Sequence, residues 1–376
     1  MKSIYLDNHS TTPLDPNVFL SMQPWFLEKI GNPSSRNHIY GWEAAEAVEL
    51  ARESIGKIIN ASARDIIFTS GATDSNNIAL QGVMKNSTKH HIITLNTEHK
   101  AVLDIFKEFK KLGHDVTFLS VKKNGLIDLD KLQNAIKSNT YLISIMHINN
   151  EIGVEQPISN IGKICRENNI IFHVDAAQSL GKVHIDVSKL EVDLLSISSH
   201  KVYGPKGVGA LFIKGNSKKI DLKPIKFGGG HEKNLNPGTL AVPNIVGFGD
   251  ACKIAQQLID SEKNRISKLR DALLAGILNK NPKIKVNGSL NHRVSGNLNI
   301  TIPNNSNEEL IARMPEISIS TGSACTSNNL EPSHVLKAIG LSSKEAHSSL
   351  RFGIGRFNNQ NDIEIAINCL NRSIRK

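Results

Sequence analysis

The distribution of apolar residues predicts a chain in which buried strands alternate with helices. Continuous apolar runs predict strands over 66–69, 91–95, 116–120, 141–147, 170–174, 193–198 and 208–213. Helical patterns fill several of the intervals, at 73–84, 100–112, 129–137 and 158–168. Strand–helix alternation is typical of βαβ units, and continuous apolar strands are expected where helices cover both faces of a sheet. The sequence predicts an α/β fold with a mostly parallel sheet between two layers of helices.

The pattern changes after Pro243, where one long helix is predicted over about 245–278. Short strands at 283–286, 297–302 and 317–320 then mix with helices at 332–339 and 362–373, which indicates a smaller α+β unit. Two domains also suit 376 residues, at about 150 residues per domain. We expect a large domain over 15–258 and a small domain made of 1–14 and 259–376.

Small and polar residues follow the predicted strands, and ligands bind beyond the carboxyl ends of strands in parallel sheets. The first strand is followed by Ser70-Gly71-Ala72-Thr73 at a helix start, where exposed N–H groups attract phosphate. The alternative is an ordinary helix start capped by Ser70 or Thr73. Later strands are followed by polar turns that carry His99 and Asn150.

Asp175 and Lys201 follow two other strands. A carboxylate, an amine and an anion cradle at one sheet edge suit a ligand with a protonatable ring nitrogen, an aldehyde and a phosphate. Pyridoxal 5'-phosphate has all three groups. The alternative is a structural ion pair between Asp175 and Lys201.

One cysteine and two arginines have settings that suit chemistry. Cys325 lies in a run of small polar residues, Ser-Thr-Gly-Ser-Ala-Cys-Thr-Ser-Asn-Asn, and an accessible thiolate is a nucleophile. Cys165 and Cys369 occupy helical positions and are predicted to lie in the core. Arg351 and Arg356 lie near glycines, and the planar guanidinium suits a substrate carboxylate; surface ion pairs are the alternative.

Charge and composition exclude several classes of protein. Lys and Arg number 45 against 35 Asp and Glu, a net charge of +10, but the basic residues are scattered and only 5% of residues are aromatic. We therefore predict no direct nucleic-acid site. The clearest apolar run, 141–146, is far shorter than the ~20 residues of a membrane span. Asp7 and His9 stand where an export signal would be apolar, so we expect a cytoplasmic protein.

Longer motifs identify a family. The chain contains YLDNHSTTPLDP, FTSGATDSNNIAL, MHINNEIGV, FHVDAAQS, SSHKVYGPKGVGALF and STGSACTSNNLEPSHVLKAIG. Over nearly its whole length it resembles the cysteine desulfurases, which are class V, fold-type I pyridoxal-phosphate enzymes, and most of all the housekeeping iron–sulfur-cluster type. The resemblance implies removal of sulfur from L-cysteine, which yields L-alanine and a persulfide on Cys325.

The resemblance also implies a role for each matching residue around the cofactor ring. Lys201 would hold the cofactor covalently and shuttle the α-proton, and Asp175 would pair with the pyridinium nitrogen. His99 would stack on the ring and transfer protons. Gln178 and Asn150 would bond the side of the ring that carries the oxygen.

Further matches concern the phosphate, the substrate and the partners. The phosphate would be held by Ala72, Thr73, Ser198 and His200, together with Thr239 from a neighbouring subunit, which implies a homodimer. Arg351 would bind the carboxylate of L-cysteine, with Asn32 nearby and Asn150 also in contact with the substrate. The sulfur would pass to an acceptor protein, either an iron–sulfur scaffold or a carrier for tRNA thiolation.

Three alternatives stay open on the sequence. The first two are a selenocysteine lyase and a class V aminotransferase, which share the cofactor site. The third is an inactive binding subunit of a sulfur relay. It is suggested by Asn236-Pro237, which stand where the family usually has Arg-Ser and so remove a positive charge.

Overall fold

A mixed sheet forms the centre of the larger lobe in the computed structural model, which describes residues 3–85, 90–215, 220–321 and 331–374. Within these ranges the sheet has seven strands in the order β2-β8-β7-β6-β5-β3-β4. The strands are β2 (Ile66–Thr69), β8 (Gly209–Ile213), β7 (Leu194–Ser198), β6 (Ile171–Asp175), β5 (Thr140–Ser144), β3 (His91–Leu95) and β4 (Asp115–Leu119). In this described sheet β8 runs in the direction opposite to the other six strands, so the prediction of a mostly parallel sheet is confirmed.

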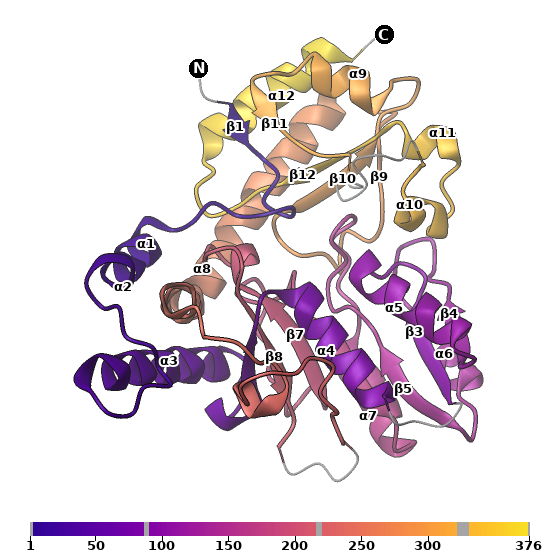
Figure 1. Ribbon diagram of the computed structural model, residues 1–376. Coiled ribbons are helices and arrows are strands. Elements are labelled where there is room, and N and C mark those ends of the chain that lie inside the picture. The colour runs from indigo at the N-terminus through magenta and orange to yellow at the C-terminus, as the bar shows by residue number, and fades with distance from the viewer. Residues whose placement is uncertain (1–2, 86–89, 216–219, 322–330, 375–376) are drawn as a thin grey trace.

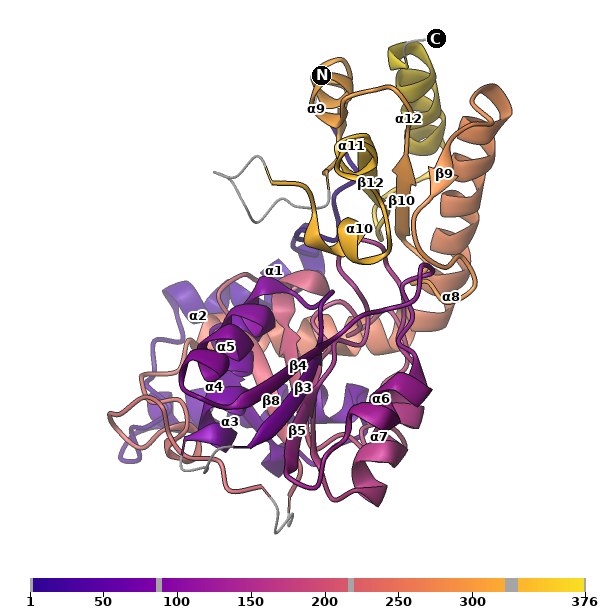
Figure 2. The ribbon, with the colours of Figure 1, turned by 90° about the vertical axis from the view of Figure 1, so that its right-hand side faces the viewer.

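Helices cover both faces of this sheet (Figures 1 and 2). One face packs on α4 (Ala72–Met84) and α5 (Lys100–Lys111). The other packs on α3 (Ile39–Ile58), α6 (Leu129–Ala135), α7 (Ile158–Glu167) and the first half of α8 (Val242–Lys280). Neighbouring strand residues alternate between the two cores: Ile66 and Phe68 belong to one, and Ile67 belongs to the other. Both sides of each strand are therefore buried, which explains the continuous apolar runs.

A smaller lobe packs on the second half of α8. It holds a three-stranded sheet in the described ranges, β12 (Ser349–Gly353), β10 (Asn297–Thr301) and β9 (Lys285–Val286), and a parallel pair, β1 (Ile4–Tyr5) with β11 (Ile317–Ser318). Its helices are α9 (Asn307–Ala312) and α12 (Gln360–Ser373). The chain enters from β1 at the top of Figure 1 and passes to α1 (Pro16–Met22) and α2 (Pro24–Leu27) on the large lobe.

The buried side chains of α8 pack in different lobes along its length. Phe248 and Cys252 lie in the core of the large lobe, whereas Leu273 and Ile277 lie in that of the small lobe.

Two short helices, α10 (His334–Ala338) and α11 (Ser343–Ala346), lie between β11 and β12 in the sequence but pack on the core of the large lobe through Leu336 and other residues. We propose that residues 15–258 form one domain and that residues 1–14 and 259–376 form the other. The second domain contacts the first through α10 and α11.

The differences between the sequence prediction and the structure include the end of one strand and a missed helix. The strand predicted over 141–147 ends at Ser144, although the backbone N–H groups of Ile145 and His147 still donate to β6. The twenty-residue helix α3 was not predicted. It buries small residues such as Gly41 and Ala44 and exposes Trp42, so its apolar periodicity is weak. None of the helices in the described ranges has the length and apolar character that crossing a bilayer requires.

Candidate active site

A cavity of about 570 Å³ lies at the carboxyl ends of the central strands, within the size range of small-molecule sites. Residues from both lobes line it. Ten of the residues predicted from the sequence are among them: Ala72, Thr73, His99, Asn150, Asp175, Gln178, Ser198, His200, Lys201 and Arg351. The structure therefore brings most of the predicted site together around one space.

The start of α4 forms one end of the cavity. Its N-cap is Gly71, at φ +152°, and no side chain caps the helix. The alternative of a cap from Ser70 or Thr73 is therefore wrong; the Ser70 hydroxyl pairs with Asp74 instead, at 3.1 Å. Backbone N–H groups in a first helical turn have no intrahelical partner and favour an anion. This end of the cavity fits a phosphate.

His200 lines the same cavity. Its Nδ1 is 3.1 Å from the Thr11 hydroxyl. Burial, with the charge of Lys201, lowers the pKa of His200 to about 4. The ring is therefore neutral at pH 7, and it contributes hydrogen bonding rather than charge to the anion site.

Asp175 ends β6 and is 6% exposed. Its two carboxylate oxygens accept hydrogen bonds from the Ala177 backbone N–H, at 3.0 Å, and from Nδ2 of Asn76, at 2.9 Å. No salt bridge joins it to Lys201 or to another basic side chain of the described residues, so the predicted alternative of an Asp–Lys pair is wrong. A buried carboxylate that faces a cavity without a cationic partner fits a protonated ring nitrogen.

Lys201 reaches the same cavity from the short 3₁₀ turn η2 (Ser199–Lys201) after β7. Its ammonium donates to the backbone carbonyls of His9 and Ser10, both at 2.6 Å. These carbonyls hold the amine at the cavity wall. The position suits a lysine that condenses with an aldehyde.

His99 and Gln178 add oriented polar groups. Nδ1 of His99 accepts the backbone N–H of Ala101, at 3.1 Å, so the neutral ring carries its proton on Nε2. Oε1 of Gln178 accepts from Lys182, at 3.0 Å, and Nε2 donates to the carbonyl of His9, at 2.8 Å. An amide nitrogen has two hydrogens, so Gln178 keeps one for a bound ligand.

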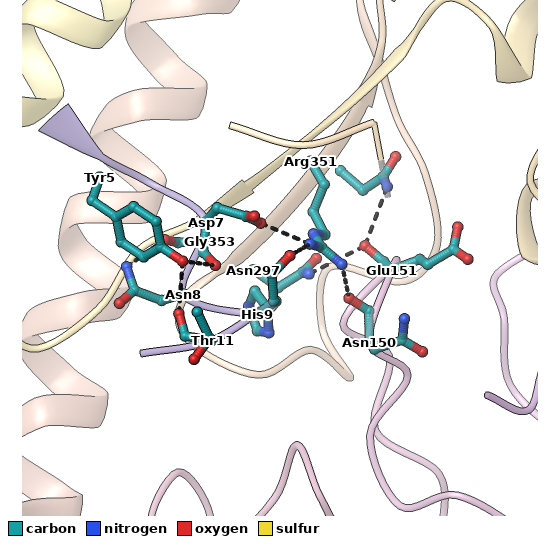
Figure 3. Close-up of polar contacts among 12 residues, drawn as sticks. Tyr5, Asp7, Asn8, His9, Thr11, Asn150, Glu151, Asn297, Arg351 and Gly353 are labelled. Carbon is teal, nitrogen blue, oxygen red and sulfur yellow. Dashed lines mark hydrogen bonds and ion pairs between the residues drawn. The ribbon is translucent and has the colours of Figure 1, made fainter. Parts of the chain in front are cut away.

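Arg351 enters from β12 of the small lobe and is 2% exposed (Figure 3). Nη1 donates to the backbone carbonyl of Asn150, at 2.8 Å. Nη2 donates to the Asp7 carboxylate and to the Ser10 hydroxyl, both at 2.7 Å. The side chain therefore joins the two lobes at the cavity, and the alternative of a surface ion pair is wrong for Arg351.

Arg356 has a different environment. Its guanidinium pairs with Asp15, at 2.7 Å, and with Glu262, at 2.6 Å, and it lies over the ring of Tyr203. These contacts tie the two lobes together outside the cavity. Arg356 is therefore a structural ion-pair residue.

Two predicted residues of the described ranges, Asn32 and Thr239, are not brought to the cavity wall. Asn32 is exposed, and its side chain accepts the backbone N–H of Ser34. Thr239 is also exposed. Cys325 lies outside the described residues. Cys165 and Cys369 are buried, as predicted.

Sequence reasoning missed Asp7, His9, Ser10 and Asn76 as parts of the site. The first three belong to a turn more than 340 residues before Arg351 in the chain. Asn76 lies one helical turn beyond the predicted anion cradle, on the side of α4 that faces Asp175. The sequence signal that could have indicated Asn76 was a polar residue in the helix that directly follows the end of β2.

Known proteins resemble the chain over its whole length. The family model for aminotransferase class-V matches residues 4–365. The chain is 50% identical to the cysteine desulfurase IscS of Methylobacillus flagellatus, over 99% of this chain and 92% of that protein. It is 47% identical to the mitochondrial cysteine desulfurase of Arabidopsis thaliana, over 100% of this chain and 83% of that protein.

Solved structures agree with these matches. A NifS-like protein has a TM-score of 0.92 with the chain at 33% identity, over 99% of both chains. SspA, solved in complex with cysteine, has a TM-score of 0.83 at 38% identity, over 94% of this chain and 99% of that one. This chain therefore belongs to the aminotransferase class-V family and, within it, to the cysteine desulfurases.

Proposed function

We propose that the chain is a pyridoxal-phosphate-dependent L-cysteine desulfurase that converts L-cysteine to L-alanine and passes the sulfur on. One observation carries the proposal: a single cavity gathers an uncapped helix start at Gly71, the buried carboxylate of Asp175, the amine of Lys201 and the guanidinium of Arg351. These groups suit, in turn, a phosphate, a ring nitrogen, an aldehyde and a substrate carboxylate.

Each residue then has a defined task. When bound, the cofactor supplies an electron sink for the bonds at the substrate's α-carbon. Asp175 holds a proton at the ring nitrogen, and the Lys201 amine takes the α-proton. His99 transfers a proton through Nε2, because its Nδ1 is engaged by Ala101. Arg351 orients the carboxylate of L-cysteine. Ser198, His200 and the α4 start hold the phosphate.

We assign the nucleophile to Cys325. Its thiolate attacks the sulfur of the substrate, so an S–S bond forms as the C–S bond breaks. The electron pair of the broken bond stays on the substrate carbon, which takes up a proton on the way to alanine. Cys325 is left as a persulfide, and no external oxidant is needed.

We further propose a homodimer. Large apolar side chains are at least half exposed on α1, α2 and the start of α3: Phe19 at 50%, Leu20 at 61%, Phe26 at 57%, Leu27 at 73% and Trp42 at 55%. Gathered apolar exposure of this kind is typical of an interface. In the dimer, the exposed Thr239 would complete the phosphate site of the partner subunit, and Asn32 would lie near the substrate.

The acceptor and the compartment follow from the same proposal. From the resemblance to the housekeeping type, we propose delivery to an iron–sulfur scaffold or to a tRNA-thiolation carrier. We propose a cytoplasmic location, because the cysteines in the described ranges are free thiols, which suits a reducing compartment.

The first experiment records the absorbance spectrum of the purified protein and then adds L-cysteine with a reductant. We expect a yellow protein that forms alanine and sulfide in equal amounts. Parallel assays with selenocysteine and with amino donors test the lyase and aminotransferase alternatives. A yellow protein that forms neither product would favour the inactive relay subunit.

The nucleophile is tested by Cys325→Ala. We expect this variant to keep the cofactor spectrum and to lose sulfide release from L-cysteine. Cys165→Ala is the matched control, because Cys165 is buried in α7 and has no part in the reaction. Native sulfide release from Cys325→Ala would exclude Cys325 as the nucleophile.

A further inference from the structure

Arg351 has few N–H groups left for a ligand. A guanidinium carries five, and three of those on Arg351 donate to Asn150, Asp7 and Ser10 in the described residues. The N–H at Nε is buried without a partner among those residues. Two N–H groups are therefore left without a partner in the described residues, and because the one at Nε is buried, only the second N–H of Nη1 is left to contact a carboxylate oxygen.

The hydroxyl of Ser10 supplies what Arg351 lacks. Its oxygen accepts from Nη2 of Arg351, at 2.7 Å, and a hydroxyl that accepts one bond can still donate its own hydrogen. Among the described residues, Ser10 Oγ donates to no protein acceptor, and Ser10 lines the cavity. We propose that Ser10 is a second carboxylate-binding residue, whose hydroxyl donates to the substrate carboxylate beside Arg351.

The backbone of Ser10 strengthens this assignment. Its carbonyl accepts from the ammonium of Lys201, at 2.6 Å. Ser10 therefore contacts both the amine of Lys201 and the guanidinium of Arg351. In the proposed reaction the amino group of the substrate would take the place of the Lys201 amine, and the carboxylate of the substrate would face the guanidinium. In an α-amino acid these two groups are bonded to the same carbon. Ser10 is thus placed to select α-amino acids over amines that lack the carboxylate.

The turn that carries Ser10 is fixed from both lobes. The backbone N–H of Ser10 donates to the carbonyl of Asp7, at 3.0 Å, and that of Thr12 donates to the carbonyl of His200, at 2.9 Å. Nδ2 of Asn8 donates to the carbonyl of Gly353, at 2.8 Å. The hydroxyl is therefore held in place before a ligand arrives, which lowers the entropic cost of binding.

The test is Ser10→Ala in the holoenzyme. We expect the KM for L-cysteine to rise about tenfold, equivalent to about 1.4 kcal/mol, with kcat changed less than about twofold. The Kd for L-alanine, followed by the change in cofactor absorbance, is expected to rise by the same factor. The Kd for cysteamine, which has the amine and thiol but no carboxylate, is expected to stay within about twofold of wild type.

Two further variants complete the design. Ser10→Thr keeps the hydroxyl and is expected to recover most of the affinity for L-alanine. Ser3→Ala is the matched control in the same N-terminal segment, since the Ser3 hydroxyl bonds Ser318, at 3.0 Å, outside the cavity. Thermal unfolding of each variant checks that the fold is kept.

The inference rests on the proposed function only in that Arg351 faces the carboxylate of the substrate. Wild-type affinity of Ser10→Ala for L-alanine would overturn it, and so would equal weakening of L-alanine and cysteamine binding. Binding of L-alanine needs no turnover. A wild-type protein that binds L-alanine but releases no sulfide from L-cysteine would therefore refute the proposed function and leave the Ser10 test intact.

Discussion

Glu151 follows Asn150 in the cavity-lining loop, and its carboxyl group is expected to make stability depend on pH. The side chain is 4% exposed, and its Oε2 accepts the Ser333 hydroxyl at 2.5 Å. Burial raises the pKa of Glu151 from 4.5 to about 7, while the Ser333 bond and the charge of Arg351 oppose the rise. Figure 3 shows Glu151 beside this arginine network, with Asn297 donating to its backbone carbonyl.

The sign and size of the effect follow from this pKa. The folded state binds the Glu151 proton more tightly than the unfolded state, so the stabilisation is complete below pH 4.5 and is lost as the pH rises through about 7. A pKa shift of one unit corresponds to about 1.4 kcal/mol, so the rise of the Glu151 pKa from 4.5 to about 7 corresponds to about 3 kcal/mol of unfolding free energy. Most of that loss falls between pH 5 and pH 8.

The assay compares wild type with Glu151→Gln by urea unfolding of the holoenzyme at pH 5 and pH 8. Glutamine keeps the shape and can still accept from Ser333, but it does not titrate. We expect wild type to lose about 2 to 3 kcal/mol more than the variant over this interval. Glu28→Gln, at an exposed site, is the control and should follow wild type. Parallel losses in wild type and Glu151→Gln would refute the reasoning.

Two further predictions concern the cofactor end and the small lobe. Gly71→Ala places a side chain at φ +152°, a strain of about 1–3 kcal/mol, and is expected to weaken cofactor binding about tenfold or more in a titration of the apoprotein. Gly340→Ala, at φ +96° with no atom near its Cβ, should cost stability but leave cofactor affinity unchanged. Leu273→Ala, in the small-lobe core at 0% exposure, is expected to cost about 2–5 kcal/mol of unfolding free energy. Leu290→Ala, at 43% exposure, should stay within about 0.5 kcal/mol of wild type.

The sequence placed the cofactor end of the site well, because that end follows a local rule. Asp175 ends a buried strand, Ala72 and Lys201 each follow one within three residues, and parallel strands end at one edge of the sheet. Finding the strands was therefore sufficient to bring these three residues together. The exposed Thr239 could be interpreted only through the family, because its proposed role lies in another subunit.

The remaining polar groups of the site depend on contacts that no local pattern encodes. Asn76 reads as an ordinary helical residue until α4 is packed on β6 and its amide meets Asp175. Helix α3 was missed for a related reason, because small residues such as Ala44 form its buried face. In both cases the identity of the partner, rather than the pattern of the segment, decides what the residue does.

The N-terminal segment shows how the two lobes share one site. β1 pairs with β11, and Asp7 bridges to Gly353, so residues 4–8 belong to the small lobe. Thr12 then pairs with His200 on the large lobe. Ser10 lies between these anchors, with its hydroxyl on Arg351 and its carbonyl on Lys201. The distance between the substrate end and the cofactor end is therefore set by the same short turn that joins the lobes. Any movement of one lobe against the other must change the contacts of residues 7–12 as it changes the width of the cavity.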